Sequence, residues 1–175
     1  MRTRPDLEQA VAFLTTRVKA PDTDDSKKLG RVLRYLKHAP HIPLTLEADG
    51  THSIKWWIDA SFAVHGDMRS HTGGTMSMGK GSVTTVCRKQ RINTTSSTEA
   101  EVVAVHEVLP TILWTRYFLE AQGYKVNKST VFQDNMSSIL LEKNGKASSG
   151  KRTRHMNIRY FFVTDRIKSK EIDIE

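Results

Sequence analysis

The spacing of apolar residues changes at about residue 43, and this change most restricts the folds open to the chain. Residues 5–19 and 28–39 repeat their apolar side chains every three to four positions, which is typical of helices with one buried side. Residues 43–48 and 54–64 instead have the short apolar runs of strands. The sequence therefore predicts a helical pair, too small to form a domain alone, followed by a unit built on a sheet.

The order of the later elements predicts the kind of sheet. Residues 73–90 read as a hairpin that turns at Gly79-Lys80-Gly81. A long helical pattern follows and ends near Gly123, with Pro110 inside it as an expected kink or break. The remaining ranges read as strand, helix, helix and strand, at 129–135, 137–145, 157–167 and 171–175. This order predicts an α/β fold with a mixed sheet over residues 46–175, preceded by a helical unit over residues 1–45.

Composition narrows the class of protein. The single cysteine, Cys87, excludes an internal disulfide framework and fits a reducing compartment, so we expect an intracellular, cytoplasmic protein. No apolar stretch approaches the roughly 18 residues that a membrane span needs, so no membrane partner is expected. We expect the three tryptophans, Trp56, Trp57 and Trp114, to lie in the core.

The positive charge is concentrated in one part of the chain. The net charge is +8, and residues 146–170 hold eight Lys or Arg and one Asp, which leaves +1 for the remainder. A charge run is usually a solvated helix face, but this concentration favours contact with the phosphates of a nucleic acid. The candidate contacts are Lys151, Arg152, Arg154, His155 and Arg159.

Two aspartates occur where strand ends can converge. Asp59 lies in an otherwise apolar, aromatic strand, where a buried carboxylate needs a partner or a metal; the alternative is an edge or turn position. Asp134 ends a short strand just before a helix. It is therefore either a site residue or the N-cap of the helix that begins near Asn135.

The serine-rich segment that opens the long helix supplies a third acid, and helical phase separates its two glutamates. With Ser96 as N-cap, Glu99 takes the N3 position of a capping box, which is a structural role. Glu101 instead shares its side of the helix with the apolar stripe expected to lie on the sheet. Glu101 is therefore the glutamate predicted to join Asp59 and Asp134.

A group of three carboxylates points to a particular chemistry. Their mutual repulsion is tolerable only when cations neutralise it. Ligands that are all oxygen favour Mg²⁺ or Mn²⁺, and no His/Cys set has the spacing of a zinc site. Beside a basic segment, such a group suggests two-metal phosphodiester cleavage.

With these residues in place, the chain resembles the ribonuclease H domain of copia-type retrotransposon polyproteins. The resemblance rests on IDASFAVHGDMRSHTGG, RKQRINTTSSTEAE, LWTRYFLEAQG, VFQDNMSSILLEKN and GKRTRHMNIRYFF. Upstream, RPDLEQAVAFLT and LGRVLRYLKH resemble the end of the reverse transcriptase of the same polyprotein.

The resemblance implies a fold, an activity and a setting. The fold is ribonuclease H-like, with three antiparallel strands followed by strands parallel to the first. The activity is hydrolysis of the RNA strand of RNA/DNA hybrids during reverse transcription, with two Mg²⁺ or Mn²⁺ ions held by Asp59, Glu101 and Asp134. The implied partners are the hybrid and the reverse transcriptase, in cytoplasmic virus-like particles.

One departure from the family pattern sets the alternative function. The family continues past the last strand into T-E-D-x-x-A-D, whose Asp supplies a fourth metal carboxylate. The sequence ends at Glu175, and neither Asp165 nor Asp173 matches that motif, so the fourth acid and the C-terminal helix are expected to be missing. The alternative is a non-catalytic, nucleic-acid-binding or scaffold remnant of the polyprotein. A transposase or integrase would carry its acids in the order Asp, Asp, Glu, which differs from the order here.

Overall fold

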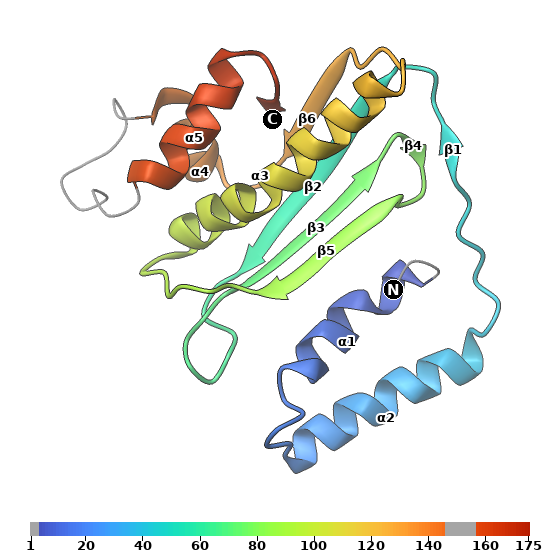
Figure 1. The fold of residues 1–175 in the computed structure, drawn as a ribbon. Coiled ribbons are helices and arrows are strands. Elements are labelled where there is room, and N and C mark those ends of the chain that lie inside the picture. The colour runs from blue at the N-terminus through green and yellow to red at the C-terminus, as the bar shows by residue number, and fades with distance from the viewer. Residues whose placement is uncertain (1–3, 146–156) are drawn as a thin grey trace.

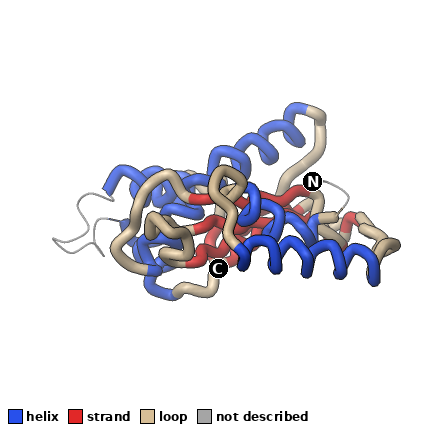
Figure 2. The backbone as a smooth tube through the Cα atoms, turned by 90° about the horizontal axis from the view of Figure 1, so that it is seen from below, coloured by secondary structure: helices blue, strands red, loops and turns tan. Residues whose placement is uncertain are grey.

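A five-stranded mixed sheet forms the centre of the molecule, and helices lie on both sides of it (Figures 1 and 2). The computed structural model describes residues 4–145 and 157–175. The helices are η1 (Pro5–Leu7), α1 (Glu8–Thr15), α2 (Thr23–His38), α3 (Ser97–Ala121), α4 (Met136–Asn144) and α5 (Asn157–Lys168). The strands are β1 (Glu47–Ala48), β2 (Ser53–Ser61), β3 (His71–Ser77), β4 (Gly79–Lys80), β5 (Thr84–Lys89), β6 (Lys128–Phe132) and β7 (Asp173–Ile174).

The strand order confirms the predicted sheet. The order across the sheet is β5-β3-β2-β6-β7. Strands β2, β3 and β5 pair antiparallel, whereas β6 runs parallel to β2 and β7 runs parallel to β6. Because a parallel neighbour needs a crossover connection, α3 links β5 to β6 and lies against the sheet on the way.

The central strand β2 has one face toward α3 and one face away from it. Alternate β2 residues from Ile54 to Ala60 are buried in the same core cluster as the α3 residues Val105, Val108 and Ile112. The isoleucine and valine side chains of this cluster each contribute roughly 1.5–3 kcal/mol when fully buried. The core therefore sits between β2 and α3.

The expectation that all three tryptophans lie in the core is wrong for two of them. Trp56 is fully buried, but Trp57 is 43% exposed and Trp114 is 61% exposed. Trp57 is on the β2 face that α3 does not cover, where its ring stacks on Phe132 with centroids 5.3 Å apart. Trp114 stacks on Phe118 at 5.0 Å on the outer side of α3. Both rings stay partly in solvent despite these contacts.

Helix α3 begins as predicted but does not break at Pro110. The Ser96 side chain accepts a hydrogen bond from the Glu99 amide at 3.2 Å, and the helix then runs without interruption to Ala121. An internal proline costs about 3 kcal/mol because it removes one backbone hydrogen bond and crowds the preceding turn. The neighbouring Leu109 and Ile112 are completely buried, and this packing offsets the cost.

The N-terminal helices α1 and α2 lie beside the β5 edge (Figure 1). Asp22 is the N-cap of α2, and Asp25 is the N3 partner in a reciprocal capping box. The ring of Phe13 in α1 stacks on His65, in the segment after β2, at 5.6 Å. Leu29 and Leu33 of α2 are 48% and 58% exposed, so part of its apolar side is open to solvent. Among the described residues, none of the helices has the length and apolar character of a membrane span.

Candidate metal centre

Strand register brings Asp59 and Asp134 side by side. The parallel pairing of β2 and β6 ends at Trp57 and Phe132. Asp59 lies two residues after Trp57, and Asp134 lies two residues after Phe132. Both aspartates are therefore at the carboxyl edge of the sheet. Because the carboxyl ends of neighbouring parallel strands lie at one edge, this edge is where such sheets place their sites. Both aspartates are exposed.

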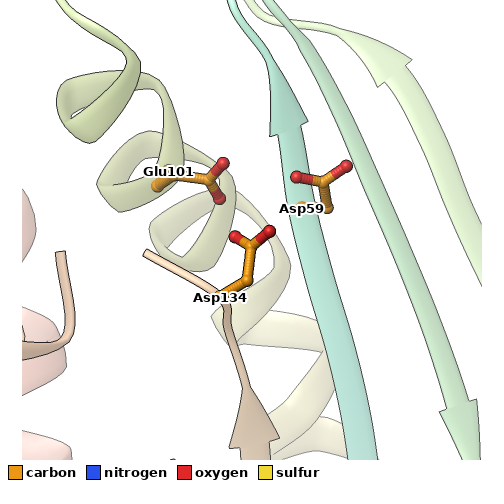
Figure 3. A group of neighbouring side chains, drawn as sticks. All are labelled: Asp59, Glu101 and Asp134. Atoms are coloured by element: carbon orange, nitrogen blue, oxygen red, sulfur yellow. The ribbon is translucent and has the colours of Figure 1, made fainter. Parts of the chain in front are cut away.

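Glu101 completes the group from the first turns of α3 (Figure 3). Its carboxylate points toward those of Asp59 and Asp134, and one ligand oxygen from each of the three lies within 4.8 Å of the others. The Glu101 side chain is 4% exposed, and its Oε1 accepts a hydrogen bond from the Ala60 amide at 3.2 Å. The structure thus brings together the three acids that helical phase and strand ends predicted. Their role as ligands stays a prediction.

The structural alternative for Asp134 does not hold, whereas Glu99 has a structural role. Asn135, not Asp134, is the N-cap of α4, because its Oδ1 accepts a hydrogen bond from the Ser138 amide at 3.0 Å. The carboxylate of Asp134 therefore has no capping role. At the start of α3, Glu99 accepts hydrogen bonds from both the amide and the hydroxyl of Thr95 at 2.7 Å, so Glu99 holds the entry to the helix.

The electrostatics of the group favour a cation. The pKa of the Glu101 carboxyl is raised to about 7, chiefly by burial and also by the charges of Asp59 and Asp134, while the hydrogen bond from the Ala60 amide acts against this shift. Divalent cations would relieve this repulsion, and carboxylate oxygens are the ligands that Mg²⁺ and Mn²⁺ prefer. The three residues therefore fit a hard divalent cation. Within 4–145 and 157–175, they are the only group of this kind.

A neighbouring amide, Gln133, was not found by the sequence reasoning. Its Nε2 lies 3.4 Å from the Glu101 Oε2, a long contact that orients the carboxylate weakly. The only signal in the sequence is its position beside Asp134. Its backbone amide donates to the Glu175 carbonyl at 2.9 Å, which ties this edge to the last residue of the chain.

The predicted nucleic-acid contacts fall largely beyond what the structure describes. Lys151, Arg152, Arg154 and His155 lie outside the described residues. Arg159 lies in the first turn of α5, where the backbone alone is described. These five residues stay a prediction.

Metal binding is expected to depend on pH through Glu101. The pKa of its carboxyl is about 7, so a cation must displace a proton below that pH. We expect Mn²⁺ affinity, measured by isothermal titration calorimetry, to be about tenfold weaker at pH 6 than at pH 8. The Glu101→Gln variant should lose this difference. Equal affinities at the two pH values for the unmodified chain would contradict the assignment.

The comparisons with known proteins agree with this geometry. No family model matches the chain. Over 173 residues it is 27% identical to the "Retrovirus-related Pol polyprotein from transposon TNT 1-94" of Nicotiana tabacum, covering 98% of this chain and 13% of that protein. Over 169 residues it is 30% identical to the corresponding polyprotein "from transposon RE2" of Arabidopsis thaliana, covering 95% and 12%. The chain thus spans about an eighth of the length of these polyproteins.

A shorter relative and a solved structure complete the comparison. The "Secreted RxLR effector protein 161" of Plasmopara viticola is 34% identical over 113 residues, which are 64% of this chain and 80% of that protein. The structure of LC11-RNase H1, isolated from compost by a metagenomic approach, superposes with a TM-score of 0.52 at 10% identity, covering 71% of this chain and 82% of that one. A likeness at this identity concerns the fold. The homologues of this chain are therefore retrovirus-related Pol polyproteins of copia-type transposons, and its sheet and helices have the ribonuclease H fold.

Proposed function

We propose that this chain is the ribonuclease H part of a transposon Pol polyprotein and hydrolyses the RNA strand of RNA/DNA hybrids with divalent cations. The observation that carries the proposal is the convergence of Asp59, Glu101 and Asp134 within 4.8 Å at the carboxyl edge of a ribonuclease H-type sheet. Family membership supports a nucleic-acid substrate. The domain division proposed with it is a reverse transcriptase end over residues 1–45 and a ribonuclease H unit over residues 46–175.

The three acids would hold two Mg²⁺ or Mn²⁺ ions, and each acid has a different setting. When bound, such ions supply an activated water and stabilise the leaving oxygen of the scissile phosphate. The buried Glu101 is held in place by the Ala60 amide, so it supplies a fixed ligand. The exposed carboxylates of Asp59 and Asp134 line a groove of about 690 Å³, where a phosphate can approach them. The chain's own contribution is to fix the ions next to this groove.

The test is cleavage of an RNA/DNA hybrid labelled on its RNA strand, in Mg²⁺ and in EDTA, with the chain as it is. We expect cleavage of the RNA strand in Mg²⁺ and none in EDTA, with a DNA duplex of the same sequence left intact. The Asp59→Asn variant should lose cleavage, since it removes one anionic ligand while the exposed position tolerates an amide. Hybrid binding without cleavage in Mg²⁺ or Mn²⁺ would instead support the non-catalytic, hybrid-binding alternative.

A further inference from the structure

One side of helix α2 carries a row of unpaired positive charge. Residues 26–38 contain five Lys or Arg and no acidic residue. Lys27, Arg31 and Arg34 follow one another at spacings of four and three, so they lie on the same side of the helix. All three are exposed. Among the ion pairs of the described residues none involves these three, whereas the neighbouring Lys28 is paired with Asp24 at 2.8 Å.

The net charge summed over the chain does not reveal this basic side of α2. The acids of the α2 capping box and first turn precede the basic row directly, and acids elsewhere nearly cancel the rest. A regional sum of +1 therefore gave no sign of a basic surface. The helix separates the charges by placing its acids at its N-terminus and its bases along one side.

Two neighbouring hollows on the surface lie between the candidate metal centre and the basic side of α2. The groove that holds Asp59 and Asp134 adjoins a second hollow of about 400 Å³ between α1, α2 and the segment after β2. Lys28 and Arg31 line this second hollow. The two hollows share Gln9, Ser61 and His71 in their walls, so they lie directly next to each other. A nucleic-acid strand that runs from the carboxylates into the second hollow would reach Arg31 of α2.

We propose that the basic side of α2 binds the phosphate backbone of the nucleic-acid strand that runs through this groove. The row from Lys27 to Arg34 is about 10 Å long at 1.5 Å per residue, so it offers successive contacts along a strand. Arginine and lysine at exposed positions give affinity that does not depend on base sequence and falls with salt. The inference deepens the proposed function, on which it rests for the path of the strand, and it assigns the N-terminal helices a direct part in holding the substrate.

The test is binding of a fluorescein-labelled RNA/DNA hybrid, followed by anisotropy in EDTA so that no cleavage occurs. We expect the Arg31→Ala/Arg34→Ala variant to bind about five- to tenfold more weakly at low salt, with a salt dependence less steep by about two in log–log slope. The matched control is Lys80→Ala/Lys125→Ala, which removes the same charge from exposed positions outside both hollows. The control should bind within about twofold of the unmodified chain.

The outcomes separate this inference from the proposed function. Equal weakening in the two double variants would show a non-specific effect of net charge and overturn the inference. Unchanged affinity in the α2 variant would overturn it as well, even if the chain cleaves hybrids. Weaker binding in the α2 variant of a chain that cleaves nothing would leave the inference standing and count against the catalytic proposal. Circular dichroism melting checks the fold, since both arginines are exposed and neither forms an ion pair among the described residues.

Discussion

The Glu101→Gln substitution is expected to lower metal-dependent cleavage of an RNA/DNA hybrid by about 10³-fold or more. Loss of one anionic ligand weakens charge stabilisation worth several kcal/mol, and about 4 kcal/mol corresponds to that factor. The amide has nearly the same shape as the carboxylate, and its oxygen can still accept from the Ala60 amide. Ionisation of Glu101 opposes folding, because its carboxyl has a raised pKa in the folded chain. Replacing it with a neutral glutamine should therefore not destabilise the metal-free fold. Initial rates in Mg²⁺ and melting temperatures in EDTA measure the two effects separately.

The matched control is Glu99→Gln, which changes the same charge two residues earlier. Glu99 serves the entry to α3 through the Thr95 amide and hydroxyl, so its variant should keep cleavage within a few fold. Its free energy of unfolding should fall by about 0.5–1 kcal/mol, as for a weakened helix cap. Equal loss of cleavage in both variants would mean that the helix N-terminus, and not the ligand, was disturbed.

The Glu142→Gln substitution is expected to raise the free energy of unfolding by about 2 kcal/mol at pH 8. Glu142 of α4 is completely buried, and within the described part of the chain its Oε2 has no hydrogen-bond partner. Its Oε1 lies 3.4 Å from the Ser138 hydroxyl, which is too long for a strong bond. The pKa of this carboxyl is raised to about 8, chiefly by burial and also by the charge of Glu101, while the Ser138 hydroxyl acts against this shift.

The sign of the pH dependence follows from this raised pKa. Above about pH 4.5 the unfolded chain releases the proton, whereas the folded chain keeps it until about pH 8. The folded state binds more protons in that window, so the free energy of unfolding falls as pH rises through it. A glutamine does not titrate, so the variant loses the fall in the free energy of unfolding that Glu142 causes. The fall that Glu101 causes remains. The gain should therefore be large at pH 8 and small near pH 5.

Urea unfolding at pH 5 and pH 8 in EDTA measures this effect. The control is Glu120→Gln, at an exposed site on α3 that forms an ion pair with Arg116 at 3.0 Å. That variant should change stability by less than about 0.5 kcal/mol and keep the pH dependence of the unmodified chain. A Glu142→Gln variant whose gain in stability over the unmodified chain is no larger at pH 8 than at pH 5 would contradict the raised pKa.

Much of the sheet and of the acidic group could be predicted because each rests on local periodicity. A strand alternates every two residues and a helix repeats every 3.6, so the phase of Glu101 relative to the apolar side of α3 can be read from neighbours within two turns. The last β2–β6 pair places Asp59 and Asp134 together for a similar reason, since the carboxyl ends of parallel strands lie at one edge.

Other features of the site depend on which distant segments meet, and local pattern carries no information about that. Trp57 and Trp56 are adjacent aromatics in one strand, yet only the covering of one sheet face by α3 makes one buried and the other 43% exposed. Gln133 and Glu142 read as ordinary polar residues of a strand end and a helix. Their environments arise from the packing of α3, α4 and α5 around the carboxyl edge of the sheet.

The sequence by itself determined the element order, the family and the three acids, because these depend on residue type, spacing and helical phase. The tertiary structure decided which aromatic rings stay exposed, that the Glu142 Oε2 is buried with no hydrogen-bond partner among the described residues, and that the groove beside Asp59 adjoins a hollow lined by Arg31 of α2. Burial and surface shape are sums over contacts between segments far apart in the chain. No single stretch of sequence holds that sum, so these features appear only when the segments pack together.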